Sequence, residues 1–156
     1  MVTNAISERL EAWREAERRW ERPGSADRVR ARALDVIAAW AAFQDASLPA
    51  DTDELMLVTD DTSTYVAATK GAQRVLGYQP VELIGHTIAD LAAPDLRGAT
   101  PAQWSAFVLA GRQDGTFRLR AKDGREIALR FQARAHHPIP GFHMSRLWPD
   151  AGFAER

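Results

Sequence analysis

Three of the four histidines lie close together near the C-terminal end of the chain, and imidazole is a common ligand for metal ions. His136, His137 and His143 have a spacing that a zinc ion could use, but the sequence offers no apparent fourth ligand. The chain has no cysteine, which excludes disulfides, thiol chemistry and Cys-based metal sites. We therefore expect a solvated loop here and no metal site.

Catalytic motifs are missing from the sequence. It contains no Gly-rich phosphate loop followed by Lys, no nucleophile elbow and no zinc-protease helix signature. Asp60 and Asp61 lie in a segment rich in turn formers, where their carboxylates suit turn chemistry better than an acid–base pair. We expect a protein that is not an enzyme.

The last predicted strand, residues 142–148, carries the most informative polar side chains. Residues alternate between two faces of a strand, so His143 and Ser145 share one face, and Met144 and Trp148 share the other. We expect the first face to meet the interior, with His143 and Ser145 as polar groups for a ligand. The second face would then pack on the N-terminal helices. The alternative for His143 is a core histidine bonded to Ser145 or to backbone.

The elements that position these residues follow from periodicity and turn signals. Strands are predicted at residues 55–59, 64–68, 116–120, 127–135 and 142–148, with an Asp-Gly turn at 123–124. Between the second and third strands the pattern predicts short helices: one capped by Thr69 and ending at Gly77, one begun by Pro80, a helical turn near 88–91, and a longer helix capped by Thr100 and ended by Gly111. An antiparallel sheet with helices on one side, an α+β fold, satisfies this order.

Residues 1–50 have a helical pattern with a break predicted at Pro23-Gly24 and Ser25 as the next N-cap. We expect a helical hairpin that buries too little surface to be stable alone. It must pack on the following domain or on a second copy, so we predict a homodimer through these helices. The expected domains are residues 1–50 as this extension, 51–150 as the globular domain and 151–156 as a disordered tail.

Two motifs in residues 54–149 resemble the PAS domain family. Residues 75–85, Val-Leu-Gly-Tyr-Gln-Pro-Val-Glu-Leu-Ile-Gly, are similar to its Gly-Tyr and Glu-Leu-Ile-Gly run, and residues 117–127 are similar to its strand–turn–strand with Lys-Asp-Gly. Thr69-Lys70 stands where the family often has Asn-Pro. The resemblance implies a five-stranded antiparallel sheet that cups a small interior, with the short helices as its lid.

The resemblance also implies a sensory module that binds a small molecule or passes a signal through flanking helices. The expected ligand-binding residues are Ile84, Ile88, Leu91, Trp104, Phe107, Val108, Phe117, Leu119, Leu129, Phe131, His143 and Ser145. This interior is apolar and aromatic, so a flat or aliphatic ligand is expected. The alternative is a fully packed core without a cavity.

The remaining functional hypotheses differ in the cofactor that the protein would bind. Flavin–cysteine photochemistry, known in one branch of the family, is excluded because the chain lacks cysteine. A haem-binding PAS protein for gas or redox sensing is an alternative function, with His143 as the first candidate ligand. A ligand-free dimerisation module is another alternative.

Charge and hydropathy indicate where the protein works. The net charge is −1, and the outward arginines Arg118, Arg120, Arg130 and Arg134 lack aromatic interleaving, so we expect no nucleic acid partner. No apolar run approaches the ~20 residues that span a bilayer, so we expect no membrane association and a cytoplasmic location. We also expect the chain to be too short for an output domain, so that any output protein acts in trans.

Overall fold

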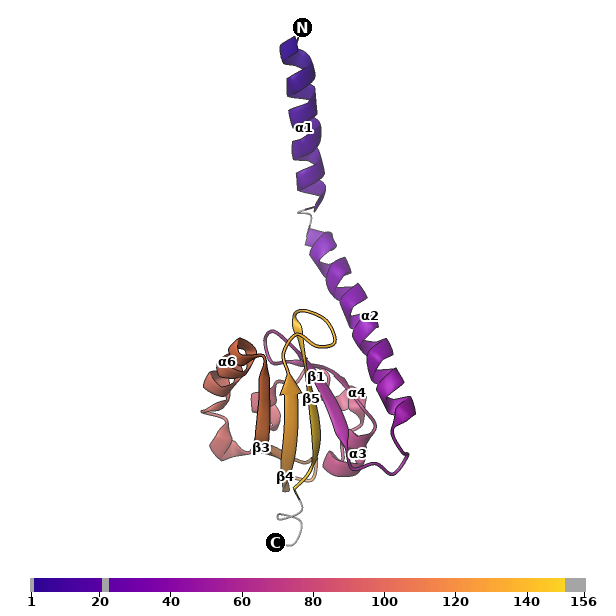
Figure 1. The fold of residues 1–156 in the computed structure, drawn as a ribbon, viewed down its shortest axis with the longest axis vertical. Coiled ribbons are helices and arrows are strands. Elements are labelled where there is room, and N and C mark those ends of the chain that lie inside the picture. The colour runs from indigo at the N-terminus through magenta and orange to yellow at the C-terminus, as the bar shows by residue number, and fades with distance from the viewer. Residues whose placement is uncertain (1, 21–22, 151–156) are drawn as a thin grey trace. The chain divides into compact units, whose positions relative to one another are not determined.

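The computed structural model describes residues 2–20 and 23–150. Helices α1 (Val2–Trp20) and α2 (Pro23–Ser47) precede the sheet (Figure 1). One compact unit ends at Val36 and another begins at Ile37. No helix within the described ranges is long and apolar enough to cross a membrane.

The break between the two long helices lies earlier than predicted. Pro23 is the first residue of α2, and Ser25 lies inside the helix and is not its N-cap. Proline is favoured at this position because the first N–H of a helix needs no intrahelical partner. The connection at residues 21–22 lies outside the described residues, so the predicted hairpin stays a prediction, and so does the predicted disordered tail at residues 151–156.

Five antiparallel strands form one sheet in the order β2-β1-β5-β4-β3, which confirms the α+β fold. They are β1 (Leu55–Asp60), β2 (Tyr65–Ala68), β3 (Arg112–Arg120), β4 (Glu126–Arg134) and β5 (Phe142–Pro149). Strand β3 begins four residues before the predicted start at Thr116, because Arg112 to Thr116 continue to pair with Arg134 to Arg130 of β4. The Asp-Gly turn between these strands has Gly124 at φ 91°, as predicted.

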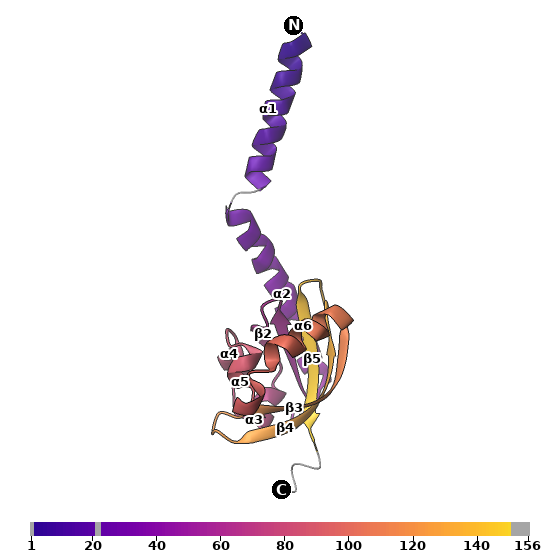
Figure 2. The same ribbon diagram turned by 90° about the vertical axis from the view of Figure 1, so that its left-hand side faces the viewer.

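Short helices gather on one side of the sheet (Figure 2). They are α3 (Gly71–Leu76), α4 (Pro80–Leu83), α5 (Ile88–Leu91), a 3-10 turn (Pro94–Leu96) and α6 (Thr100–Ala110). Pro80 begins α4 as predicted, and Gly77 and Gly111 end α3 and α6 with φ of 78° and 81°.

Both predicted threonine caps are wrong. The hydroxyl of Thr69 accepts a hydrogen bond of 2.8 Å from the backbone N–H of Met56, which joins the start of α3 to β1. The hydroxyl of Thr100 donates to the carbonyl of Leu96 at 2.9 Å, inside the preceding turn. In both cases the threonine hydroxyl, which local sequence rules predict as a helix cap, forms its hydrogen bond with a backbone group outside the helix.

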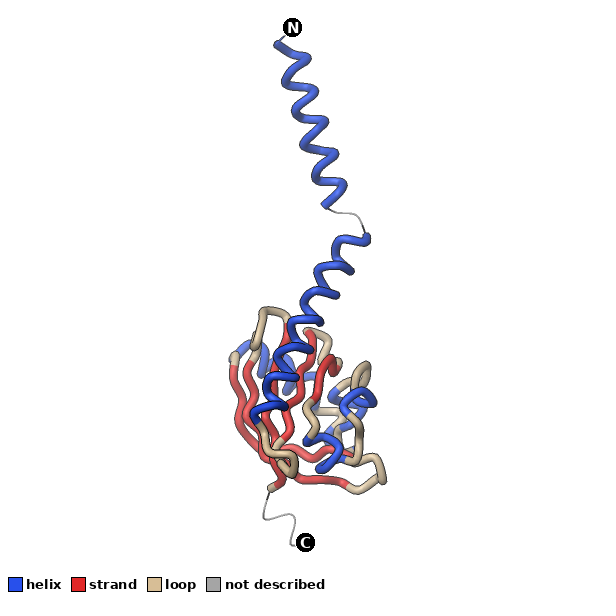
Figure 3. Tube along the Cα trace, turned by 90° about the vertical axis from the view of Figure 1, so that its right-hand side faces the viewer, coloured by secondary structure: helices blue, strands red, loops and turns tan. Residues whose placement is uncertain are grey.

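The outer face of the sheet is covered by the C-terminal part of α2, which crosses the strands in Figure 3. Ile37 and Ala41 are buried there, as are Met56, Val58 and Met144, which point to this face by strand alternation. The end of α2 therefore belongs with the sheet, in the compact unit that begins at Ile37, and the predicted domain boundary at residue 50 stays a prediction.

Candidate functional site

A cavity of ≈ 300 Å³ lies between the inner face of the sheet and helix α6. Its apolar wall comes from alternate strand positions, because residues two apart point to the same face. Phe117 and Leu119 of β3, Phe131 of β4 and Leu147 of β5 supply this wall, and Phe107 of α6 closes the other side. The complete lining is Leu57, Thr59, Tyr65, Ile88, Thr100, Gln103, Trp104, Phe107, Gln113, Asp114, Gly115, Thr116, Phe117, Leu119, Phe131, Ala133, Ser145 and Leu147.

Polar side chains enter this lining at a few points. Tyr65 is buried and Ser145 half-buried, on β2 and β5 respectively. Burial raises the pKa of the Tyr65 phenol above its ordinary value, with a smaller contribution from the Asp90 carboxylate. The tyrosine hydroxyl therefore stays protonated and can donate a hydrogen bond.

Seven of the predicted ligand-binding residues line the cavity. They are Ile88, Trp104, Phe107, Phe117, Leu119, Phe131 and Ser145. These residues share an inward direction set by strand alternation or by their place on α5 and α6.

The other five predicted residues do not line the cavity. Leu91 and Leu129 are buried in the packed core beside it. Ile84 is the C-cap of α4, in extended conformation, and is 50% exposed. Val108 follows Phe107 on α6 and is turned about 100° away from it around the helix axis. His143 faces inward but lies behind the α6 aromatic side chains.

His143 makes a fully satisfied set of contacts. Its ring is edge-on to Trp104 and Phe107, with centroid distances of 5.1 and 6.1 Å. The Nδ1 atom accepts a hydrogen bond of 3.1 Å from the backbone N–H of His136. Since Nδ1 is an acceptor, the proton of the neutral ring lies on Nε2, which donates to Asp61 Oδ1 at 2.8 Å. These bonds are those that the core-histidine alternative describes, a buried ring bonded to backbone, with Asp61 as a partner that the sequence did not indicate.

These bonds do not suit a metal ion or a haem iron. Asp61, His136 and His143 place possible ligand atoms within 4.8 Å of one another. However, both ring nitrogens of His143 are already engaged, and His136 Nδ1 accepts from the N–H of Gly141 at 3.0 Å. His137, the third member of the predicted zinc group, instead lies edge-on to Trp40 at 6.1 Å. A metal would have to break hydrogen bonds that the fold already satisfies.

Trp104 joins the cavity to this histidine. It lines the cavity, contacts the His143 ring, and donates from Nε1 to the carbonyl oxygen of Asp61 at 3.3 Å. A molecule that displaced Trp104 would therefore disturb the turn between β1 and β2 as well.

Several lining residues escaped sequence reasoning. Gln113, Asp114 and Gly115 were missed because the predicted third strand began too late. Tyr65 was assigned to a strand but not to the site, and the alternating burial of β2 in the structure places it on the inner face.

One of the outward arginines, Arg118, forms ion pairs within the domain. Arg118 contacts Asp95 and is 2.7 Å from Glu126. The hydrogen bond from Arg118 lowers the pKa of the Asp95 carboxyl. Arg118 therefore finds its acidic partners in the adjoining turn and strand.

The class of protein follows from comparisons with known proteins. Residues 65–139 match the family model described as the PAS fold. The fold is similar to a PAS domain from Colwellia psychrerythraea (TM-score 0.60, 17% identity, 75% of this chain and 98% of that one). It is also similar to the PAS domain of an HTR-like protein from Haloarcula marismortui (TM-score 0.59, 15% identity, 80% and 99%) and to Drosophila melanogaster Cycle PAS-B with bound ethylene glycol (TM-score 0.55, 16% identity, 62% and 99%). No curated protein sequence matches.

An antiparallel sheet of this strand order, with short helices over a hollow inner face, is the architecture of a PAS domain. Residues 65–139 match the PAS fold model, and the sheet with its short helices has the fold of a PAS domain; helices α1 and α2 precede the sheet.

Proposed function

We propose that this protein is a PAS sensory module of the cytoplasm that binds a small apolar ligand and signals as a dimer to an output protein in trans. The cavity of ≈ 300 Å³ is the observation that carries this proposal. Its volume lies at the lower end of the range for small-molecule sites, and its wall is mainly aromatic and aliphatic. Protein partners remain part of the proposal because the signal must leave the domain.

The dimer is proposed from apolar side chains that the N-terminal helices leave exposed. On α1, Ile6, Leu10 and Trp13 lie at helical spacing and are 62%, 45% and 58% exposed. On α2, Val29 and Phe43 are separated by two heptads and are 65% and 71% exposed. Apolar residues at heptad spacing favour a coiled coil, so a second copy is the proposed occupant.

A catalytic role is not part of the proposal. The pair of His143 and Asp61 has the arrangement of a general base and its orienting carboxylate, but a base needs a free nitrogen that faces a substrate. Both nitrogens of this ring are bonded, and the residue is 2% exposed.

Mass spectrometry of the purified protein tests both the bound ligand and the dimer. The mass measured under native conditions should equal two chains plus a small molecule, and the denatured mass should equal one bare chain. Leu10→Glu with Trp13→Glu should give monomers, whereas Ala12→Glu, exposed and turned about 100° from Trp13 around α1, should leave the dimer intact. A bare monomer in wild-type samples would refute the proposal, and a bare dimer would favour the ligand-free dimerisation module.

A further inference from the structure

The hydroxyl group of Tyr65 has no hydrogen-bond partner among the residues that the structure describes. Tyr65 is 3% exposed, and its backbone N–H and C=O bond to His86 and Gly85. Within residues 2–20 and 23–150, no side-chain hydrogen bond of Tyr65 is found. No fully sealed polar side-chain atom lacks a partner in those residues, so the hydroxyl oxygen keeps some accessible surface. Tyr65 lines the cavity, which places that surface next to the ligand space.

The accessible part of the Tyr65 hydroxyl is open to a hydrogen bond from a molecule in the cavity. A ligand that supplies a hydrogen-bond partner to this largely desolvated group gains affinity over one that leaves it unpaired. Because burial raises the pKa of Tyr65, the phenol stays protonated and offers a proton. The matching group on a ligand is a hydrogen-bond acceptor, such as a ring nitrogen or a carbonyl oxygen.

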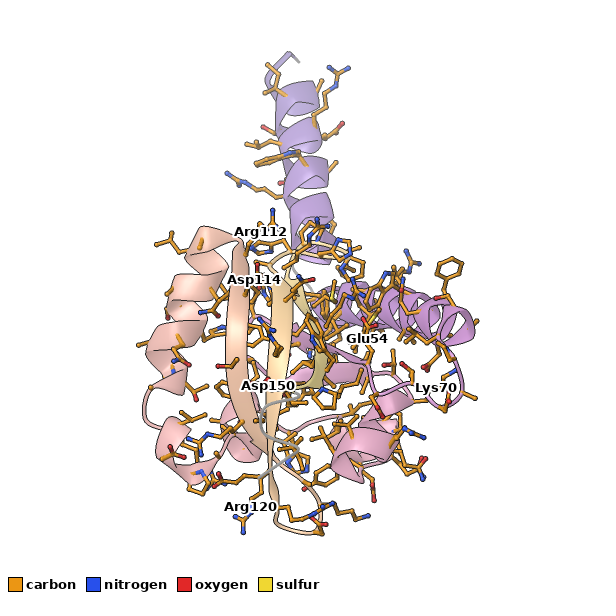
Figure 4. All side chains as sticks on the ribbon, turned by 60° about the horizontal axis from the view of Figure 1, so that its bottom comes forward. Glu54, Lys70, Arg112, Asp114, Arg120 and Asp150 are labelled. Carbon is orange, nitrogen blue, oxygen red and sulfur yellow. The ribbon has the colours of Figure 1, made fainter. Side chains whose placement is uncertain are left out.

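The side chains that line the cavity offer little charge to bind an ionic ligand. Among the described lining residues there is no Lys, Arg or His, so a buried anion would have no counter-charge. The one carboxylate, Asp114, is on the exposed part of β3, close to Arg112 in Figure 4. An uncharged ligand avoids the desolvation cost that an ion would meet.

The shape of the ligand follows from the aromatic wall. Phe117 and Phe131 of the sheet and Trp104 and Phe107 of α6 line the same cavity, and aromatic side chains favour stacked or edge-on contact with flat rings. We infer that the cavity takes an uncharged aromatic molecule that carries a hydrogen-bond acceptor, and that the Tyr65 hydroxyl binds this acceptor. This inference rests on the proposed ligand-binding function.

Naphthalene and quinoline are a matched pair of probes, because quinoline has the same size and adds one ring nitrogen. Their dissociation constants can be measured by NMR shift titration of wild-type protein and of Tyr65→Phe at neutral pH, where quinoline is uncharged. The ratio of the two constants should change by about two- to tenfold between wild type and variant, the range expected for one neutral hydrogen bond. Comparing ratios removes the difference in hydration between the probes. An unchanged ratio would overturn the inference.

Two further measurements separate the possible failures. Naphthoate, which adds a negative charge, should bind the wild type at least tenfold more weakly than naphthalene, and equal binding would overturn the uncharged class. A Cβ at Gly115 would meet only Phe131, at 3.5 Å or more, so Gly115→Val should fold and place its methyl groups in the cavity. This variant should bind neither probe.

If neither naphthalene nor quinoline shifts the signals of cavity residues in the wild type, the proposed function itself fails, and with it the inference. Binding of both probes with an unchanged ratio would overturn the inference alone.

Discussion

The ammonium group of Lys70 donates a hydrogen bond of 2.8 Å to the backbone carbonyl of Asp45 near the end of α2. It also donates to the carbonyl of Leu48 at 2.9 Å, and the Lys70 backbone N–H donates to Asp45 Oδ1 at 2.9 Å. The last carbonyls of a helix lack intrahelical partners and carry partial negative charge. A cation from the start of α3 therefore holds the end of α2, at the position where the family often has proline.

Lys70→Met should loosen this connection. The variant keeps most of the side-chain volume but removes two charge-assisted hydrogen bonds, so we expect a loss of about 1–3 kcal/mol in the free energy of unfolding. Urea denaturation measures the loss. Lys122→Met is the matched control, because Lys122 is 55% exposed and bonds to Glu82 on the surface, where a salt bridge contributes about 0–1 kcal/mol. Equal effects of the two substitutions would show that Lys70 is an ordinary surface lysine.

Gly71→Ala should be strongly destabilising. A Cβ at Gly71 would lie 2.2 Å from the backbone oxygen of Glu54, and a backbone atom at the start of β1 cannot move aside easily. We expect a loss of about 2–3 kcal/mol, as for other overpacked core positions. Gly98→Ala provides the comparison, because a Cβ there meets nothing within 4 Å. That control should be neutral or slightly stabilising in thermal unfolding. A stable Gly71→Ala protein would mean that α3 is not held against β1 as described.

The fold was predictable where a residue's role depends on its near neighbours in sequence. The alternation of Phe117 and Leu119 indicated the inner face of β3, and glycines 77 and 111 ended their helices as expected. Thr69 shows the limit of such rules. Its hydroxyl can cap a helix locally, but Met56, brought beside it by the sheet, offers a buried N–H that takes it instead.

The candidate site was predictable only in part, for the same reason. Strand alternation correctly placed His143 on the inner face. Its partner Asp61 is 82 residues away and is a plausible turn residue, so nothing local indicates their contact. Whether inward residues pack solidly, like Leu129, or line a cavity, like Phe131, depends on how α6 crosses the sheet.

Acid should weaken the contact between α4 and the β3–β4 turn. A hydrogen bond from Lys122, at 2.6 Å, is the largest cause that lowers the pKa of Glu82 below its ordinary 4.5, followed by the bond from the Gln79 N–H. A carboxyl with a lowered folded-state pKa stabilises the fold above its unfolded pKa, and this stability is lost as pH falls through the folded value. Urea midpoints of wild type and Glu82→Gln should therefore differ above pH 4.5 and converge below it. When both proteins also carry Lys122→Gln, the pH-dependent difference between their urea midpoints should be smaller. If the midpoints of wild type and Glu82→Gln differ by the same amount at every pH, the assignment of the lowered pKa to Glu82 is contradicted.

Replacing His143 should cost far more than replacing its partner. His143→Ala removes a buried ring and leaves the His136 N–H without its acceptor, so we expect a loss of about 2–4 kcal/mol. Asp61→Asn keeps an oxygen that accepts from Nε2, and the Asp61 side chain is 68% exposed, so the loss should stay below about 1 kcal/mol. Chemical denaturation of both variants measures the difference. Similar losses would indicate that the Asp61 charge, and not the buried ring, supplies the stability.

Haemin should not produce a His143-dependent spectrum. Iron ligation needs a ring nitrogen with a free lone pair, and His143 uses Nδ1 to accept from His136 and Nε2 to donate to Asp61. In the described part of the chain, no histidine lines the cavity where a flat ligand would lie. We therefore expect visible spectra of haemin with wild type and with His143→Gln to be the same, without a sharp Soret band. A band that forms with wild type and disappears in the variant would restore haem sensing, because it would show that the two hydrogen bonds yield to iron.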